Sequence, residues 1–510
     1  MNSPLLKITI GSHFFKLTHI HPSIRPVIMD FARKYIKYGL IKERGVFKRV
    51  AQSVFGAATK NREEFRFHIN QYEEFKEVLR NRNFTDNLLD ISKKPTPDGD
   101  SIQISMRPQW VLREEQVPVV EYLTDKDGPI SKLVELQTGS GKSLLSMYSA
   151  ATIGKRFVLL IRPMYIGKWI EDAQKYLNIE PSEIMVVQGG KNLQALIHLA
   201  IDGQLSGIKV IIISNKTYQH WITLYEDQNG DTVELGYPIS PEDFFEILGC
   251  GIRIIDEIHL DLHLQFKTDL YTNVASSIGL SATFLSTDRF VEKVQEIMYP
   301  LPIRYKGGPL KKYVSSFAAF YSIKDMTHIR TKERGQESYS HTAFEKSIRK
   351  NSLQLANYKR AIKNLVDTFF MDDYRPGERC IVFASSIDMC THITAHLKQA
   401  YPNLLVNRFV DDDPDENLYE SDISVSTVMS GGTAHDIANL KTVILTSALD
   451  SKASNIQVLG RLRYNANMAT RFVYMVCSDI PKHIAYHDSK KILLAERAKN
   501  YREYSIPVRI

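Results

Sequence analysis

The sequence predicts an α/β protein in which two tandem parallel-sheet units follow a small α+β domain. Between about residues 101 and 301, short apolar runs alternate with stretches of helical periodicity, and this alternation returns after residue 360. Apolar strands separated by helices are typical of doubly wound parallel sheets. The first hundred residues instead combine runs of alternating polarity with amphipathic helical patterns, which indicates a separate mixed domain.

The mixed domain is expected over residues 1–95. Strands are predicted at 6–9, 14–18 and 66–69, and a helix at 71–82. A first helix is predicted after Pro22, where apolar residues recur at helical spacing: Ile24, Val27, Ile28, Phe31 and Tyr35. The breaker-rich stretch 93–100 marks the end of this domain. His13, His19 and His21 lack metal-ligand spacing and are interpreted as polar strand-end residues.

The two parallel units are expected over residues 101–303 and 361–510, with a basic connector over 304–360. The buried strands of the first unit are predicted at 133–136, 157–161, 184–187, 210–213, 252–255 and 278–280. Those of the second unit are predicted at 380–383, 405–409, 423–426, 442–445 and 472–476.

The composition excludes several classes of protein. Of the 510 residues, 43% are hydrophobic and 24% charged, which excludes a disordered or collagen-like chain. No apolar run is long enough for a membrane-spanning helix, and the first residues lack a secretion pattern, so a cytoplasmic protein is expected (in the host cytoplasm if a phage encodes it). The four scattered cysteines predict neither disulfides nor a zinc site: Cys250, Cys380, Cys390 and Cys477.

Positive charge is concentrated in two segments of the chain. The formal net charge is +7, yet residues 1–60 carry 11 basic against two acidic residues, and residues 304–360 carry 13 against four. Such segments indicate either a polyanionic partner or solvated basic faces, and charge alone favours neither. Their candidate phosphate contacts are Lys34, Lys37, Lys42, Arg44, Lys48, Arg49, Lys311 and Lys312.

A glycine-rich turn follows the strand predicted at 133–136. It consists of Thr138, Gly139, Ser140, Gly141, Lys142 and Ser143. Backbone N–H groups in such a turn, together with a helix N-terminus, bind a phosphate chain. We expect Lys142 to reach the β- and γ-phosphates of ATP, and the Ser143 hydroxyl to bind Mg²⁺. Leu136 stands where the general pattern of this motif has glycine.

A pair of carboxylates follows the strand predicted at 252–255. Asp256 is expected to hold Mg²⁺, and Glu257 to polarise the water that attacks the γ-phosphate. Because the carboxyl ends of parallel strands share one edge of a sheet, we expect these carboxylates near the glycine-rich turn. The sequence therefore predicts a site for ATP hydrolysis.

With these residues, the sequence resembles superfamily 2 helicases. Residues 139–143, 256–259 and 281–283 are similar to motifs I, II and III of that family. The resemblance implies two RecA-like domains, and it implies coupling between the nucleotide and the nucleic acid through Ser281, Ala282, Thr283 and His259.

Shorter strings extend this resemblance. Gln116 resembles the glutamine that recognises adenine in the family, and residues 161–169 and 213–219 are similar to motifs Ia and Ib. In the family both motifs lie along the nucleic-acid backbone, which here implies contacts from Arg162, Lys168, Ser214 and Asn215. Trp169 is interpreted as a core residue and not as a platform for base stacking.

The second unit adds three more motifs. Ser385 lies in a string similar to motif IV, and Thr433 and Asp436 lie in one similar to motif V, which contacts nucleic acid and nucleotide. Residues 457–463 are similar to motif VI, but the second arginine comes one position early. Either Arg461 or Arg463 is therefore the candidate arginine finger, a residue worth ~10³–10⁵ in rate.

The layout resembles the phage UvsW-type branched-DNA helicases. That resemblance implies an N-terminal DNA-binding domain and ATP-driven branch migration or fork regression on branched or forked duplex DNA, as in recombination, repair or replication. Two alternatives stay open: an RNA helicase, and a scaffold that binds nucleic acid without turnover. No protein partner is inferred from the sequence.

Overall fold

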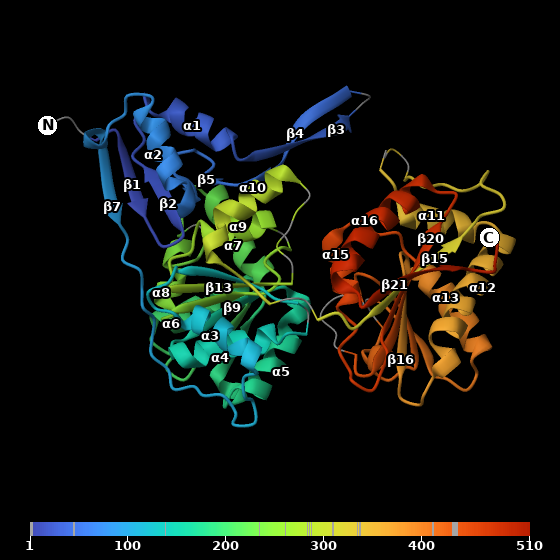
Figure 1. Cartoon of the computed structure of the whole chain (residues 1–510). Coiled ribbons are helices and arrows are strands. Elements are labelled where there is room, and N and C mark those ends of the chain that lie inside the picture. Colours follow the sequence, from blue (N-terminus) through green and yellow to red (C-terminus); the bar gives the residue numbers. More distant parts are fainter. Residues whose placement is uncertain are drawn as a thin grey trace. The chain divides into compact units, whose positions relative to one another are not determined.

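The computed structural model describes residues 4–43, 46–137, 139–233, 235–260, 262–282, 284, 286, 288–308, 311–333, 335, 338–410, 413–430 and 437–510. The chain divides into two compact units (Figure 1). The first unit consists of Met1–Leu136 and Ser140–Gly307, and the second of Gly308–Ile510 with Gln137–Gly139. Within the described ranges, no helix has the length and apolarity needed to cross a membrane.

The N-terminal module of the first unit is built on a five-stranded sheet with the order β5-β6-β2-β1-β7. Neighbouring strands are antiparallel except for β1 and β7, which are parallel. The strands are β1 (Leu6–Ile10), β2 (Phe14–Thr18), β5 (Ala57–Ala58), β6 (Phe65–His68) and β7 (Leu89–Lys93). The helices are α1 (Arg25–Arg33) and α2 (Tyr72–Arg80), preceded by η1 (Ile69–Gln71); η2 (Asp86–Leu88) precedes β7.

Local sequence explains both helices of this module. Helix α1 has a proline in its first turn, where the missing N–H costs no hydrogen bond, and it buries Val27, Ile28 and Phe31. Helix α2 has acidic residues in its first turn and Arg80 in its last turn, an arrangement that complements the helix dipole. The apolar spacing that predicted the helices is therefore confirmed as their buried face.

A long hairpin between α1 and β5 was not expected from the sequence. Strands β3 (Ile36–Glu43) and β4 (Val46–Val54) form a two-stranded sheet of their own. In Figure 1 this hairpin extends away from the five-stranded sheet. At its base the Nζ of Lys37 lies 2.5 Å from the Oδ2 of Asp288, and further along the Arg49 guanidinium stacks 4.0 Å from the Tyr38 ring centroid.

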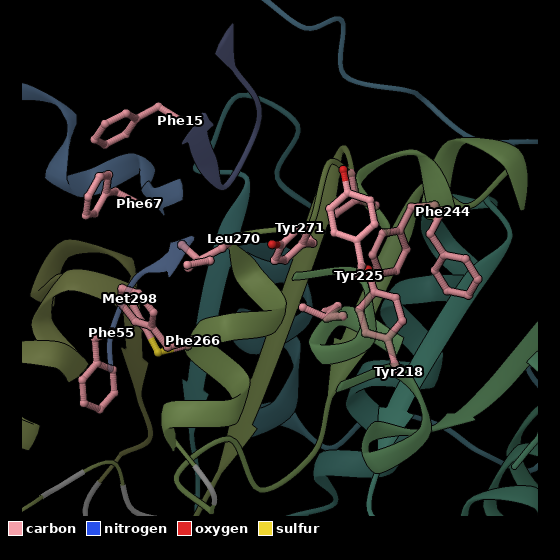
Figure 2. Packing of buried hydrophobic residues seen from close by; sticks show 14 of the residues in the cluster. Phe15, Phe55, Phe67, Tyr218, Tyr225, Phe244, Phe266, Leu270, Tyr271 and Met298 are labelled. Carbon is pink, nitrogen blue, oxygen red and sulfur yellow. The ribbon is translucent and has the colours of Figure 1, made fainter. Parts of the chain in front are cut away.

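The N-terminal module shares one hydrophobic core with the rest of the first unit. Figure 2 shows Phe55 of the module close to Phe266 and Met298 of the parallel-sheet part. The Phe55 and Phe266 rings meet edge to face, with their centroids 5.4 Å apart. Because this core is continuous, the module expected over residues 1–95 packs as part of the first compact unit.

Buried charges also join the module to the parallel-sheet part. The Arg66 guanidinium is 1% exposed, and its Nη2 lies 2.5 Å from the Oε2 of Glu242. The Nζ of Lys16 lies 2.6 Å from the other oxygen of the same carboxylate. Burial of the carboxylate would by itself raise the pKa of Glu242. The two cations outweigh this effect and lower the pKa to about 2.

His13 lies directly before β2, as expected for a polar residue at a strand end. It is also fully buried, and its ring bonds Ser12 and Ser131 at 2.7 and 3.0 Å. The stretch 93–100, expected to be a linker, forms no helix or strand after Lys93. It is bonded to the first unit, because Asn273 donates to the Pro95 carbonyl and Arg156 donates to Asp100.

The rest of the first unit is a seven-stranded parallel sheet with the order β10-β11-β9-β12-β13-β8-β14. Its strands are β8 (Ser131–Glu135), β9 (Phe157–Ile161), β10 (Ile184–Val187), β11 (Val210–Ser214), β12 (Ile252–Ile255), β13 (Ser276–Ser281) and β14 (Arg304–Lys306). Its helices are α3 (Val117–Thr124), α4 (Lys142–Ile153), α5 (Ile166–Tyr176), α6 (Gly190–Ile201), α7 (Asn215–Asp227), α8 (Phe244–Ile247), α9 (Leu262–Asp269) and α10 (Arg289–Met298). Short 3₁₀ turns are η3 (Glu114–Gln116), η4 (Pro163–Tyr165), η5 (Pro181–Glu183), η6 (Pro241–Asp243) and η7 (Leu301–Ile303).

The second unit is a seven-stranded parallel sheet with the order β17-β18-β16-β19-β20-β15-β21. Its strands are β15 (Ser315–Tyr321), β16 (Arg379–Ala384), β17 (Val406–Phe409), β18 (Ile423–Thr427), β19 (Leu440–Leu445), β20 (Arg471–Cys477) and β21 (Asn500–Ser505). Its helices are α11 (His341–Arg349), α12 (Ser352–Phe369), α13 (Ile387–Ala400), α14 (Glu416–Tyr419), α15 (Lys452–Leu459) and α16 (Pro481–Arg497), with η8 (Met371–Asp373) after α12.

The two sheets have the same strand order when each is counted from its own first strand. In both sheets, the first strand lies between the sixth and the seventh, so β15 holds the place that β8 holds. The fold class predicted from the sequence, two tandem RecA-like parallel-sheet domains after a small α+β element, is confirmed. The connector expected over 304–360 was wrong, since this stretch supplies β14 to one sheet and β15 to the other.

Candidate active site

The candidate site lies at the carboxyl edge of the first parallel sheet. Strand β13 lies between β8 and β12 and pairs in parallel with both. The glycine-rich turn follows β8, Ser281 ends β13, and Asp256 follows β12. The backbone ties the three segments together, because the Leu136 N–H donates to the Ser281 carbonyl at 3.1 Å and the Ile258 N–H donates to the Leu280 carbonyl at 3.1 Å.

The glycine-rich turn has the backbone geometry of a phosphate cradle. Gly139 and Gly141 have φ values of 84° and 88°, in the left-handed region that favours glycine. Helix α4 begins directly afterwards at Lys142, and the Lys142 ammonium donates to the Leu136 carbonyl at 3.2 Å. A Cβ at Gly141 would lie 2.8 Å from the Gln116 amide nitrogen, so the turn requires glycine there. Thr138 lies outside the described residues.

Gln116 supports this turn directly. Its side chain is 3% exposed and donates from Nε2 to the Ser140 carbonyl at 2.9 Å. Its Oε1 accepts from the Arg113 N–H at 3.0 Å. The amide therefore orients the turn, while its predicted contact with adenine remains a prediction.

Asp256 is half-buried among groups of both charges. Its Oδ1 accepts from the Glu257 N–H at 2.9 Å, and its Oδ2 accepts from the Trp169 indole at 3.0 Å. Burial and then the Glu257 carboxylate raise the pKa of Asp256, while the Lys168 and Lys142 ammonium groups and the Trp169 hydrogen bond oppose this rise. The carboxylate thus lies where a cation would stabilise its charged form.

Glu257 has the features expected of a residue that orients a water molecule. It adopts a φ of 48°, which is rare for a residue with a side chain. Its Oε2 is buried and has no hydrogen-bond partner among the residues that the structure describes. The His259 ring lies next to it, with its Nδ1 3.4 Å from this oxygen. A carboxylate oxygen without a hydrogen bond is suited to accept a proton from water.

His259 connects the strand ends of β12 and β13. Its Nδ1 lies 2.9 Å from the Ser281 hydroxyl, which brings together two residues predicted to couple motifs II and III. Burial and then the nearby Lys142 lower the pKa of His259 to about 4, so the ring is neutral at neutral pH. Ala282 is buried next to Ser281, and Thr283 lies outside the described residues.

The sequence did not single out two functional contacts on α5. Trp169 is fully buried, which confirms its interpretation as core, yet its indole also bonds Asp256. Asp172, three residues later on the same helix face, hydrogen-bonds the Ser143 hydroxyl, and burial raises its pKa despite Lys168. These contacts could have been predicted from one pattern: Lys168, Trp169 and Asp172 lie close together on one amphipathic helix.

The donor set fits a magnesium ion held together with phosphates. Ser143 offers a hydroxyl and Asp256 a carboxylate, and Mg²⁺ prefers such hard oxygen ligands. Within the described ranges, no group of three or more His, Cys, Asp or Glu side chains is placed to hold a metal without a phosphate. This matches the usual binding of Mg²⁺ through one or two protein ligands plus phosphate oxygens and water.

The predicted nucleic-acid contacts of the first unit differ in exposure. Lys168 is exposed on α5, and Arg162 lies half-buried at the start of η4. Ser214 and Asn215, where β11 leads into α7, are only 2% and 3% exposed. All four follow strands of the same sheet edge, and their contact with nucleic acid remains a prediction.

Ion pairs neutralise part of the basic charge expected to steer a polyanion. Lys34 pairs with Glu74 at 3.2 Å, and Lys37 pairs with Asp288 at 2.5 Å. In the second unit Lys312 donates to the Ala495 carbonyl at 2.8 Å. Arg44 and the Lys42 side chain lie outside what the structure describes. Simple charge counting therefore overstates the free charge of residues 1–60.

The second unit places its predicted residues near its own strand ends. The Ser385 N–H donates to the buried Glu345 carboxylate at 2.8 Å, after β16. Arg461 and Arg463 follow α15, and the Arg463 guanidinium donates to the Gly460 carbonyl at 2.9 Å. Arg461 is 9% exposed. Thr433 and Asp436 lie outside the described residues.

Comparison with solved structures supports the fold. The chain resembles S. cerevisiae Dbp5 bound to RNA and ADP-BeF3, with a TM-score of 0.51 and 11% identity, over 77% of this chain and 90% of Dbp5. Weaker likenesses are the Pyrococcus furiosus Hef helicase domain (TM-score 0.43, 13% identity, 74% of this chain and 98% of that one), and Mycobacterium smegmatis helicase Lhr bound to ssDNA and AMP-PNP (TM-score 0.46, 16% identity, 76% and 48%). No protein-family model and no curated protein matches the sequence.

Proposed function

We propose that this protein is an ATP-dependent nucleic-acid motor of the superfamily 2 helicase type. The observation that carries the proposal is the convergence of Lys142, Asp256 and Glu257 at one sheet edge, with the His259–Ser281 contact between two of its strands. A protein that only binds nucleic acid needs none of these side chains in this arrangement.

Each of these side chains has a role in ATP hydrolysis. Lys142 and the turn around Gly141 would bind the phosphate chain, and Ser143 and Asp256 would hold Mg²⁺, which supplies charge neutralisation when bound. Glu257, whose buried Oε2 forms no hydrogen bond within the described residues, would orient and deprotonate the attacking water. Arg461 or Arg463 would supply the positive charge that stabilises the transition state.

We further propose that the substrate is branched or forked duplex DNA, worked on in recombination, repair or replication. The proposal rests on the resemblance to UvsW-type helicases and on the N-terminal module. That module shares the core of the first unit, so substrate held by it would move with the nucleotide-binding sheet. Its hairpin β3–β4 offers an extended element next to such a substrate.

The experiment that tests this function compares ATP hydrolysis across nucleic acids. The purified protein is assayed with single-stranded, duplex, forked and four-way DNA and with RNA, at one nucleotide concentration. We expect forked and four-way DNA to stimulate hydrolysis most. Stimulation by RNA alone would support the second candidate, an RNA helicase, which the likeness to RNA-bound Dbp5 favours. No hydrolysis under any condition would leave only a binding scaffold.

A further inference from the structure

A basic cavity lies in the second unit, and its lining includes none of the residues assigned above. It has a volume of about 670 Å³, and its lining residues come from the segment that follows β15, from α11 and from the start of α12. Its charged lining comprises Arg330, Lys332, Lys346, Lys350 and Glu333. Four cations against one carboxylate give this cavity a strong preference for an anion.

The cations of the cavity have no salt-bridge partner among the residues that the structure describes. Within the described part of the chain, Arg330, Lys332, Lys346 and Lys350 form no salt bridge. By contrast, Arg349, between Lys346 and Lys350 in sequence, is paired with Asp388 at 2.5 Å. Four cations around one hollow, with the single carboxylate of Glu333 among the lining residues, repel one another, and a bound anion would relieve that repulsion.

The walls of the cavity are fixed by hydrogen bonds, so the cations are held together by the fold. The Arg330 N–H donates to the Ser347 hydroxyl at 3.2 Å, and the Ser340 N–H donates to the Thr331 carbonyl at 2.8 Å. The Gln354 amide donates to the Asp325 carbonyl at 2.7 Å. These bonds pin the segment after β15 to both α11 and α12.

The N-terminus of α12, which borders the cavity, does not by itself provide an anion site. Asn351 caps this helix, and its Oδ1 accepts from the N–H groups of Leu353 and Gln354 at 3.1 Å each. These N–H groups are therefore already satisfied. Binding in the cavity would depend on the lysine and arginine side chains.

The geometry of α11 indicates an extended anion. Thr342, Lys346 and Lys350 are four residues apart, so they lie along one face of the helix over about 12 Å. One strand of DNA advances about 3.4 Å per nucleotide, so this row spans about three to four phosphates. At its start, the Thr342 hydroxyl lies 3.0 Å from the hydroxyl of Ser385, the residue predicted to contact the nucleic-acid backbone.

We propose that the cavity and the adjoining face of α11 form a phosphodiester-binding site that extends the nucleic-acid path from Ser385 past Lys346 to Lys350. This inference rests on the proposed function, because it names a second contact of the same substrate. The site would contact phosphates and not bases. Lysine and arginine contacts with phosphates do not distinguish one base sequence from another.

The test uses the full chain with Lys346→Ala and Lys350→Ala combined. The matched control combines Lys398→Ala and Lys499→Ala, two exposed lysines of the same unit, so both variants lose the same charge. Binding of fluorescent forked DNA is measured over a range of salt concentrations. Melting temperature confirms folding, and hydrolysis without nucleic acid is measured in parallel.

We expect the Lys346/Lys350 variant to bind forked DNA about tenfold more weakly at low salt. The slope of log affinity against log salt should fall by about 1.8, because each duplex phosphate contact contributes about 0.9. The control variant and the hydrolysis without nucleic acid should match the wild type. A Lys346→Glu, Lys350→Glu variant should weaken binding further.

Two results would overturn the site, and a third would instead overturn the proposed function. Equal affinity and slope for the variant and the control would show that no phosphate is bound here. Weakened binding of inorganic tripolyphosphate with unchanged DNA binding would indicate a site for a free anion. If the wild type binds neither DNA nor RNA, the proposed function itself fails, whatever the variant does.

Discussion

The Trp169 indole donates a hydrogen bond over 3.0 Å to Oδ2 of Asp256, from a helix that follows a different strand of the sheet. The other oxygen of this carboxylate accepts from the Glu257 N–H. One carboxylate oxygen is therefore oriented by a rigid aromatic side chain from outside the motif, and the other by the backbone of the motif itself. We infer that Trp169 is a positioning residue for Asp256.

Replacing Trp169 by phenylalanine removes the indole N–H while keeping an aromatic ring in the core. A hydrogen bond to a charged group contributes about 1.5–3 kcal/mol, so we expect kcat for ATP hydrolysis to fall about tenfold. The control is Trp221→Phe, because Trp221 is also buried in the first unit and its Nε1 has no partner within the described ranges. Equal losses of kcat in both variants would show that Trp169 only fills space.

Glu242 is predicted to hold the N-terminal module in place through Arg66 and Lys16. In Glu242→Gln the half-buried Lys16 loses its carboxylate partner and the buried Arg66 keeps only Glu64, so the free energy of unfolding should fall by about 3 kcal/mol at pH 7. Hydrogen exchange should show the loss first in β1, β2 and β6. Glu246→Gln, an exposed neighbour, is the control, and an equally small effect of both changes would contradict this role.

The ion pairs of Glu242 with Arg66 and Lys16 also make the stability of the protein depend on acidic pH. The folded pKa of Glu242 is about 2, below its ordinary value of 4.5. Its contribution to stability is therefore complete above pH 4.5 and is lost as the pH falls from 4.5 towards 2. In Glu242→Gln, the decline of stability over this pH window should be shallower than in the wild type.

Glu345 should give the second unit the opposite dependence on pH. Burial raises its pKa to about 7, against hydrogen bonds from Ser386 and Ser385 that oppose the rise. The folded unit keeps the proton that the unfolded chain releases at 4.5, so the free energy of unfolding should fall by about 3 kcal/mol between pH 4.5 and 7. Denaturant unfolding of Glu345→Gln should lack this decline, while the exposed control Glu420→Gln should keep it.

Strands inside both sheets were predictable from the sequence because both of their faces are buried, which produces continuous apolar runs such as 157–161 and 472–476. The edge strands β14 and β21 were not, because Arg304–Lys306 and Asn500–Ser505 are polar and partly exposed. Strand β15 is apolar, but the high charge of its surroundings suggested a connector. The sequence of the hairpin β3–β4 alternates in polarity, and this pattern could have predicted its two strands.

The candidate site was predictable only where spacing along the chain determines position. Lys142 and Asp256 follow strands, and parallel strands bring their carboxyl ends together. Trp169 and Asp172 lie on a helix, and their contacts with Asp256 and Ser143 depend on how α5 packs against the sheet. Local periodicity contains no information about that packing.

ATP hydrolysis by the wild type and by Lys142→Ala, with forked DNA present, tests the central claim most directly. The exposed Lys191→Ala serves as the control. Because Lys142 is expected to stabilise the charge that develops on the phosphates, its loss should lower kcat at least ~10²-fold, with DNA affinity and melting temperature unchanged. Hydrolysis by Lys142→Ala at the rate of the wild type and of Lys191→Ala would contradict the assignment of this sheet edge as the ATP site.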